Sequence, residues 1–184
     1  MAEAAGMTRT IRWLIVGVAF VAAAGTFLGA RGCEQQRVKR ELVDGERVPV
    51  VIAGKTFRLE PALDDATRTL GLGGRKSIKP DGGMLFVFPQ PGRLEFVMRD
   101  CEADIDIAFL DDAGRVLALH AMKMEPPRGQ DEAMMAYEMR LKRYPSRYPC
   151  RVVVEVAGGT FEKLGVKEGD RMDLDLSPLK ARAR

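Results

Sequence analysis

From residue 48 onward, the apolar residues of this chain come in short runs that glycine, proline and aspartate interrupt. Runs of this length between turn-forming residues are typical of β-strands, whereas a helix needs a longer periodic pattern. We therefore expect a mainly β protein, built as a compact β-barrel or sandwich-like domain with two or three short peripheral helices. The predicted strands cover residues 48–52, 57–59, 84–88, 94–98, 104–110, 115–122, 151–156 and 172–176.

Three segments have the spacing of short helices. Residues 61–71 begin with a proline that suits a first helical turn, and residues 160–165 begin with a threonine that can cap one. Residues 131–144 form the longest predicted helix, because their apolar residues recur at helical spacing. The apolar side of that helix consists of Met134, Tyr137, Leu141 and Tyr144.

An uncharged apolar run at residues 13–30 follows a short basic start. Its length is close to what a membrane-spanning helix needs. A basic start with an apolar middle also fits a cleaved secretory signal. Gly32-Cys33 in addition resembles a bacterial lipoprotein processing site, with lipidation at Cys33. An anchor, a cleaved signal and a lipidated cysteine are the three alternatives for residues 1–33.

The same region bears on where the rest of the chain is located. More Lys and Arg residues follow the apolar run than precede it, which alone favours a cytoplasmic C-terminal side. Long domains nevertheless cross membranes largely regardless of charge, and residues 1–33 start like an export signal. We therefore expect the domain in the cell envelope, outside the cytoplasm, attached to the membrane through its N-terminal segment. Residues 34–47 would form a polar stalk, 48–177 a single β-rich domain and 178–184 a basic, frayed tail.

The charge distribution argues against nucleic-acid binding. The formal net charge is +3, but the first 33 residues carry a net charge of +2 and the tail at 178–184 carries +3. The part between them is therefore slightly acidic. Binding to nucleic acid needs a basic face or stripe, so a slightly acidic folded part argues against it.

Four stretches, taken in order along the chain, carry a family pattern. Gly71, Leu72, Gly73 and Arg75 correspond to Gly-Leu-Met-x-Arg, with Gly73 in the place of Met, and residues 83–86 match Gly-Met-Leu-Phe. Residues 98–101 stand where the pattern has Met-Lys-Asn-Thr, and residues 104–106 where it has Pro-Leu-Asp. Over residues 48–176 the chain thus resembles the family called domain of unknown function 192 (DUF192). The resemblance implies a compact, mostly β fold and often an exported location, and it implies no established activity.

Asp106 is the first candidate for a polar site. The side of its predicted strand continues into Ala108 and Leu110, which are core residues by type, so the carboxylate would be partly buried and would need a partner. Arg75, the arginine of the family pattern, is the predicted partner. The pair is either an ion pair that stabilises the fold or a ligand-binding or catalytic centre.

A row of acidic residues leads up to Asp106. If the chain were extended there, the carboxylates of Asp100, Glu102 and Asp104 would point the same way as that of Asp106. Such a row could bind Ca²⁺ or a cationic ligand. Alternatively, residues 100–103 form a loop in water and Asp104 pairs with an arginine.

His120 is the only histidine, which excludes sites that need two histidine ligands. Several methionines lie near it in sequence, and thioethers can bind Cu(I). Methionine is also a common core filler, so packing is the simpler explanation. The residues in question are His120, Met122, Met124, Met134, Met135 and Met139.

Cys101 and Cys150 are the two cysteines of the predicted domain. Outside the cytoplasm a disulfide between them is reasonable, and the alternative is two buried thiols.

No nucleophile elbow, phosphate-binding loop or dinucleotide fingerprint is present. The sequence therefore predicts an envelope-located binding or accessory module without a deducible activity, a cofactor or a catalytic residue. Its partner would be a small molecule or an envelope protein, and the domain would be monomeric. A small enzyme using Asp106 near Arg75, and an envelope protein that binds copper or calcium, are the alternatives.

Overall fold

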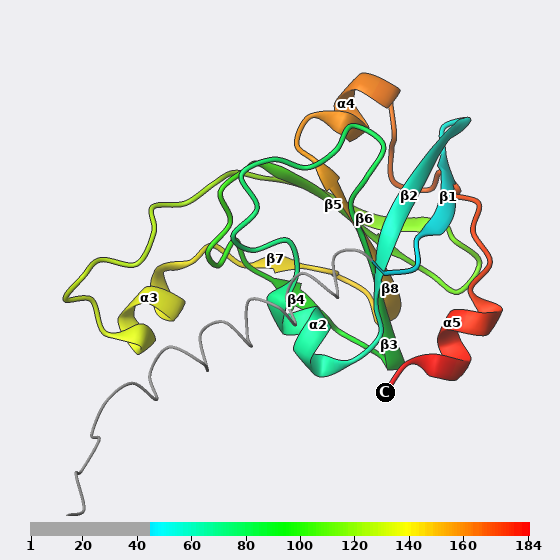
Figure 1. The fold of residues 1–184 in the computed structure, drawn as a ribbon. Helices are drawn as coiled ribbons and strands as arrows, with labels where there is room; N and C mark the ends of the chain where they lie inside the picture. Colours follow the sequence, from blue (N-terminus) through cyan, green and yellow to red (C-terminus); the bar gives the residue numbers. More distant parts are fainter. Residues whose placement is uncertain (1–44) are drawn as a thin grey trace, which may run out of the picture. The chain divides into compact units, whose positions relative to one another are not determined.

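The computed structural model describes residues 45–184, and its centre is a six-stranded mixed sheet (Figure 1). The strand order is β1-β2-β3-β8-β5-β6, and a separate pair joins β4 and β7. The strands are β1 (Val48–Ile52), β2 (Lys55–Ala62), β3 (Met84–Gly92), β4 (Glu95–Phe96), β5 (Ile105–Leu110), β6 (Val116–Met122), β7 (Tyr144–Pro145) and β8 (Cys150–Ala157). The helices are α2 (Asp65–Leu70), α3 (Met134–Arg140), α4 (Thr160–Leu164) and α5 (Ser177–Arg182).

Each face of the sheet carries its own apolar cluster, because successive side chains of a strand point to opposite faces. In β8, Val152, Val154 and Val156 belong to one cluster, together with Phe161 of α4 and Leu179 of α5. The opposite cluster contains Val153, which alternates with these valines, together with Phe86, Phe109, Met98 and Tyr144. The prediction of a mainly β, sandwich-like domain is confirmed.

The sheet does not close into a barrel within the part of the chain described here. β1 and β6 are its two edge strands. Residues 169–173 lie across both edges: Val51 exchanges backbone hydrogen bonds with Asp173, and Val116 N–H donates to Asp170. The predicted strand at 172–176 is thus reduced to isolated bridges. The backbone groups of residues 169–173 hydrogen-bond to both edge strands, whose N–H and C=O groups would otherwise be free to pair with other chains.

β2 and β3 are the one parallel pair of the sheet, and a parallel pair requires a crossover connection. Here the connection contains α2 and the glycine segment, residues 71–74. The helix predicted from residue 61 begins only at Asp65, because Pro61 and Ala62 extend β2 beside β3. Asp64 caps α2: its Oδ1 accepts from Thr67 N–H at 2.9 Å.

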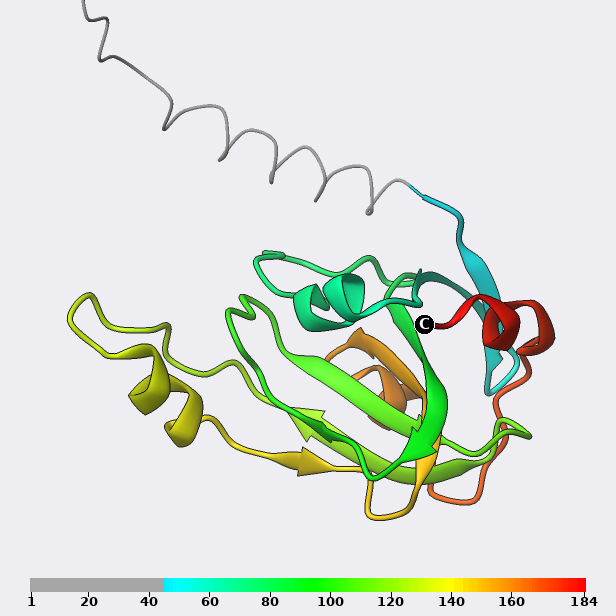
Figure 2. The same cartoon turned by 90° about the horizontal axis from the view of Figure 1, so that it is seen from below.

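The connection between β6 and β7, residues 123–143, extends away from the sheet and is called the α3 arm below (Figures 1 and 2). The predicted helix at 131–144 is shortened to α3, since Leu141 is already extended and Tyr144 pairs with Phe96. Met134 and Met139 are exposed rather than packed.

The tail predicted to be frayed forms a helix instead. Pro178 lies in the first turn of α5, Leu179 is buried in the apolar cluster beside β3, and Arg184 N–H donates to the Leu63 carbonyl. Burial of one leucine and one backbone hydrogen bond therefore order a segment whose basic composition suggested fraying.

No helix within residues 45–184 is long and apolar enough to cross a membrane. The predicted anchor or signal at residues 1–33, with Cys33, and most of the predicted stalk lie outside the described residues.

Candidate functional site

One face of the sheet carries a pocket of about 300 Å³ that we call the Glu155 pocket. Its walls come from α2 and the glycine segment, from β3, from β4 and the residues after it, and from β8. The lining residues are Asp65, Arg68, Thr69, Leu70, Gly71, Leu72, Gly73, Phe86, Phe88, Glu95, Phe96, Val97, Arg99, Cys101 and Glu155. The volume lies at the lower end of the range of small-molecule sites.

Glu155 is the buried acid of this pocket. It lies on β8 with 4% of its surface exposed, and no group within residues 45–184 donates a hydrogen bond to its carboxyl group. In that part of the chain, every side-chain oxygen or nitrogen that is fully enclosed has a hydrogen-bond partner. The Glu155 carboxyl group has none, so it is not fully enclosed, and it opens toward the pocket that Glu155 lines.

Burial raises the pKa of Glu155 to about 8, against an opposing contribution from the nearby Arg75 guanidinium. At neutral pH the carboxyl group is mostly protonated. It can then donate one hydrogen bond and accept others, and it can become a buried anion when a positive charge approaches.

The sheet register places Glu155 in a row of directly opposed residues. Glu60 on β2 lies beside Met84 on β3, which lies beside Glu155, and Ile107 and His120 continue the row on β5 and β6. Directly opposed residues present their side chains to the same face. Two carboxyl groups, those of Glu60 and Glu155, are thus buried on one face, separated by a single methionine.

Arg75 neutralises Glu60, and not Asp106 as the sequence suggested. The guanidinium group binds the Glu60 carboxylate through bidentate hydrogen bonds of 3.0 and 2.5 Å. Arg47 forms an ion pair with the same carboxylate at 3.2 Å. Such planar, paired hydrogen bonds are the strong form of a buried ion pair. The predicted Arg75–Asp106 pair is therefore wrong.

Asp106 instead holds the start of α4. Its Oδ1 accepts from Gly159 N–H at 3.1 Å, and its Oδ2 accepts from Phe161 N–H at 2.8 Å. The residue that precedes α4 is Gly159, which has no side chain to cap the helix, so an aspartate from the neighbouring strand β5 supplies the acceptor. Both oxygens of Asp106 are thereby used in structure.

Aromatic rings form much of the apolar wall of the pocket. The Phe96 ring packs edge-on against Phe86 at 5.1 Å and Phe88 at 6.5 Å between ring centroids. Edge-on packing leaves ring faces directed toward neighbouring groups, and these faces carry partial negative charge.

The two arginines of the pocket are occupied by other groups. The Arg68 guanidinium donates to the backbone oxygens of Val87 and Arg184 and to Asp65, and it stacks over Phe88. Arg99 binds Glu138 of α3 through two hydrogen bonds of 2.5 and 2.8 Å. Neither arginine offers a free pair of donors to an anion in the pocket.

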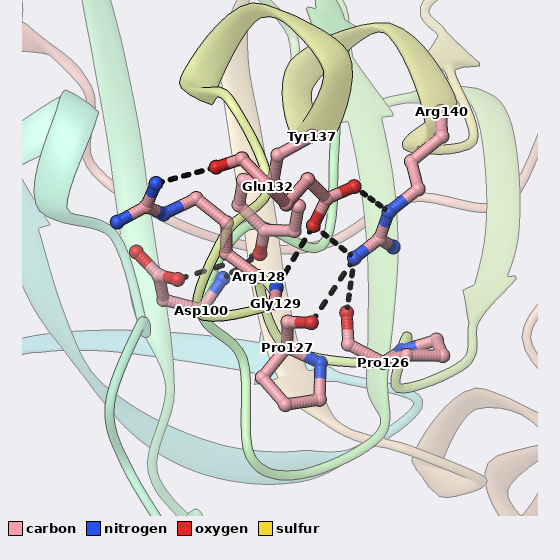
Figure 3. A network of polar contacts seen from close by, with 8 residues as sticks. All are labelled: Asp100, Pro126, Pro127, Arg128, Gly129, Glu132, Tyr137 and Arg140. Carbon is pink, nitrogen blue, oxygen red and sulfur yellow. Dashed lines mark hydrogen bonds and ion pairs between the residues drawn. The ribbon is translucent and has the colours of Figure 1, made fainter.

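The α3 arm is tied to the rim of the pocket at residues 99 and 100. Tyr137 Oη accepts from Asp100 N–H at 3.0 Å, and Asp100 has a left-handed backbone with φ 53°. Within the arm, Arg140 binds Glu132 and stacks on the Tyr137 ring, so that the helix is linked to its own loop (Figure 3). The Arg99–Glu138 pair adds a second link between α3 and the pocket.

Cys101 and Cys150 are both free thiols, so the predicted disulfide is not formed. Both contribute to the same apolar cluster, Cys150 fully and Cys101 at its margin. Burial, with smaller contributions from the Glu155 and Asp100 carboxylates, raises the pKa of Cys101 to about 12. The Cys101 side chain in the pocket is therefore a neutral thiol at neutral pH, which is a weak nucleophile.

The predicted acidic row is not a single site. Asp100 lies in a turn beside α3, Glu102 is exposed, and Asp104 pairs with Lys123 at 2.8 Å. Within residues 45–184 no three His, Cys, Asp or Glu side chains are grouped to hold a metal ion. His120 packs between Phe109 and Tyr144, and its Nε2 is 2.9 Å from the Pro145 carbonyl.

The fold and the pocket define a mixed-sheet domain with a buried acid on one face. DUF192, described as "Uncharacterized ACR", matches residues 48–174, which is most of the chain. The chain therefore belongs to the DUF192 family, as the sequence resemblance suggested. No curated protein matches it.

Two solved structures are similar to the chain. A candidate transcription regulator from Sinorhizobium meliloti 1021 is 28% identical, with 70% of this chain and 92% of that chain covered and a TM-score of 0.56. A protein of unknown function from Novosphingobium aromaticivorans DSM 12444 is 25% identical, with 71% and 88% covered and a TM-score of 0.58. These likenesses support the fold and supply no activity.

Sequence reasoning did not find Glu155. The one signal that could have found it is a single acidic residue inside an apolar run, Val152-Val153-Val154-Glu155-Val156. In a strand predicted to be buried on both faces, such a residue must lie in the core. Its position over a pocket depends on the strand order, which the sequence pattern does not reveal.

Proposed function

We propose that this domain is a binding module for a small organic molecule, held in the Glu155 pocket with the Glu155 carboxyl group as its polar anchor. One observation carries the proposal: the carboxyl group of Glu155, a residue only 4% exposed, accepts no hydrogen bond from residues 45–184 and lines a cavity of about 300 Å³. Leaving a buried polar group unpaired costs roughly 1–3 kcal/mol, and a bound molecule that pairs with it would remove that cost. The phenylalanine walls would cover the apolar part of the ligand.

Binding is favoured over catalysis by the state of two titratable groups: Cys101, which lines the pocket, and Asp106, which does not. Cys101 has a pKa of about 12 and so lacks the thiolate that nucleophilic catalysis uses. Asp106, the acid of the enzyme alternative, gives both of its oxygens to backbone N–H groups of α4. Neither residue is prepared to attack a substrate.

The binding proposal is tested by methyl NMR of the full-length protein in mild detergent, with a library of small aromatic fragments of positive, neutral and negative charge. We expect binding fragments to shift the methyl signals of Leu72 and Val97, which line the pocket. Signals of Leu119 and Leu174, which pack against the opposite cluster, should stay in place and serve as the internal control. A library in which no fragment of any charge moves the Leu72 and Val97 signals would refute the proposal.

We also propose that the domain works outside the cytoplasm, attached to the membrane through its N-terminal segment. The support is the uncharged run at residues 13–30 behind Arg9 and Arg12. Protease added to spheroplasts is expected to digest the domain while a cytoplasmic marker survives. Full protection of the domain in intact spheroplasts, with digestion only after lysis, would contradict this location.

A further inference from the structure

We propose that the ligand of the Glu155 pocket is a small organic cation, an ammonium group on an apolar or aromatic body, and that the Glu155 carboxylate is its counter-ion. This inference rests on the proposed binding function and adds the chemical class of the ligand. It follows from which charges around the pocket are already paired and which one is not.

The positive charges at the pocket are paired within the protein. Arg68 is bound by Asp65 and two backbone oxygens, and Arg99 by Glu138. Arg75, which does not line the pocket but acts on the Glu155 carboxyl group, is held by Glu60. An anionic ligand would therefore have to break an existing ion pair to find a partner.

The unpaired group of the pocket is an acid. Glu155 accepts no hydrogen bond from the described part of the chain, and its oxygens open to the cavity. A carboxylate removed from water is strongly stabilised by a cation at contact distance, since the local dielectric constant is low. An ammonium group would ionise Glu155 on binding and would occupy the place that no donor from residues 45–184 fills.

The walls favour the same class of ligand. Phe86, Phe88 and Phe96 line the apolar part of the pocket, and the faces of aromatic rings attract cations. Arg68 already covers one face of Phe88, at 4.9 Å from the ring centroid, which shows this attraction within the protein itself. A cation with an aromatic or alkyl body would contact both the rings and the carboxylate.

The proposal predicts in which direction the affinity for the ligand changes with pH. Glu155, with a pKa of about 8, must lose its proton when a cation binds, so affinity should increase as the pH rises from 6 to 8 and level off above 8. The ionised fraction of Glu155 rises over that interval from about one in a hundred to one in two, so the expected gain in affinity is about 50-fold. A neutral ligand that accepts a hydrogen bond from protonated Glu155 would show the opposite trend.

The charged and titratable groups that face Glu155 come from several elements. They are Arg75 and its partner Glu60, Cys101 and Asp100 after β4, Asp65 and Arg68 of α2, and Glu95 and Arg99 at the rim. Cys101, with a pKa of about 12, remains a neutral thiol between pH 6 and 8.

The experiment measures binding of benzylammonium and 2-phenylethylammonium to the full-length protein in mild detergent, each beside the neutral alcohol of the same shape. The Leu72 and Val97 methyl signals report occupancy, and affinities are taken at pH 6, 7 and 8. We expect each ammonium ion to bind at least about tenfold more tightly than its alcohol at pH 8. Affinity for the ammonium ions should rise with pH by the factor given above.

Two matched variants complete the test. Glu155→Gln keeps the shape of the protonated acid but cannot ionise, so it should bind the two ammonium ions at least about tenfold more weakly and without dependence on pH. Glu162→Gln removes an exposed carboxylate of α4 away from the pocket and should bind like the parent.

The outcomes separate the two proposals. If the alcohols bind as tightly as the ammonium ions, or if affinity falls from pH 6 to pH 8, the cation proposal is wrong while the binding function stands. If neither kind of probe, nor any fragment of the library, moves the Leu72 and Val97 signals, both proposals fall.

Discussion

Glu155→Gln is expected to make the protein more resistant to alkaline conditions. The pKa of Glu155 is about 8 in the folded protein, against a value of 4.5 for the unperturbed side chain. Between these two values the folded state holds a proton that the unfolded state has lost, so the free energy of unfolding of the parent falls as the pH rises from 4.5 to 8. Above pH 8 the loss is complete. Glutamine cannot titrate and avoids it.

The expected difference is large. Between pH 5 and pH 9 the parent should lose on the order of 4 kcal/mol more stability than Glu155→Gln, because each pKa unit corresponds to about 1.4 kcal/mol. Urea denaturation of both proteins at several pH values measures it, since all other titrating groups contribute equally to the two. Glu162→Gln, at an exposed position, serves as the control and should follow the parent. Parallel stability curves for Glu155→Gln and the parent would show that Glu155 ionises normally.

Gly83→Ala is expected to prevent stable folding. A β-carbon at Gly83 would stand 2.0 Å from the carbonyl oxygen of Glu155, which is far closer than atoms can approach. The backbone is also left-handed there, with φ 147°, a conformation that other residues rarely adopt. Gly83 in addition accepts a hydrogen bond from Glu60 N–H, so it cannot shift without disturbing the β2 strand.

We expect Gly83→Ala to cost about 4 kcal/mol or more, which is close to the whole stability of a small domain. The variant should be insoluble, or should melt at least 10 °C below the parent by roughly the scaling for a domain of this size. Gly92→Ala is the matched control, because a β-carbon there meets nothing within 4 Å. Equal melting temperatures for the two variants would mean that the close approach of Gly83 to β8 does not exist in solution.

The local pattern of the sequence predicted the strands well. Residues 104–110 and 115–122 were predicted to be strands, and they form β5 and β6, an antiparallel pair joined by a turn at Asp111 to Gly114. The run at 84–88 was also predicted to be a strand, and it begins β3. Alternation and turn residues act between near neighbours, so a single sequence carries that information.

The partners of charged residues could not be predicted in the same way. Asp106 was correctly placed on a buried position, but its partners, Gly159 and Phe161, follow β8 and lie more than 50 residues away. Arg75 was recognised as important, yet its partner is Glu60, on β2. Which strands become neighbours decides these pairs, and the strand order is a property of the whole sheet.

Helix ends were the other source of error. The predicted helix from residue 61 gave way to strand pairing, and the predicted helix at 131–144 was cut short when Tyr144 paired with Phe96. In both places a tertiary contact was stronger than the local helical preference, which is weak.

The parallel pairing of β2 with β3 gives two parts of the pocket, here called its floor and its roof, separate origins. Phe86, Phe88 and Glu155 belong to the central strands and form a floor whose geometry the sheet hydrogen bonds maintain. The residues from Asp65 to Gly73 form a roof that belongs entirely to the crossover connection. Substitutions in the roof can change the width of the cavity without altering a strand pair, whereas the anchoring acid cannot move unless the sheet itself is rebuilt. Under the proposed binding function, substitutions in the roof would change which molecules this domain accepts, while the acidic anchor on the sheet would stay the same.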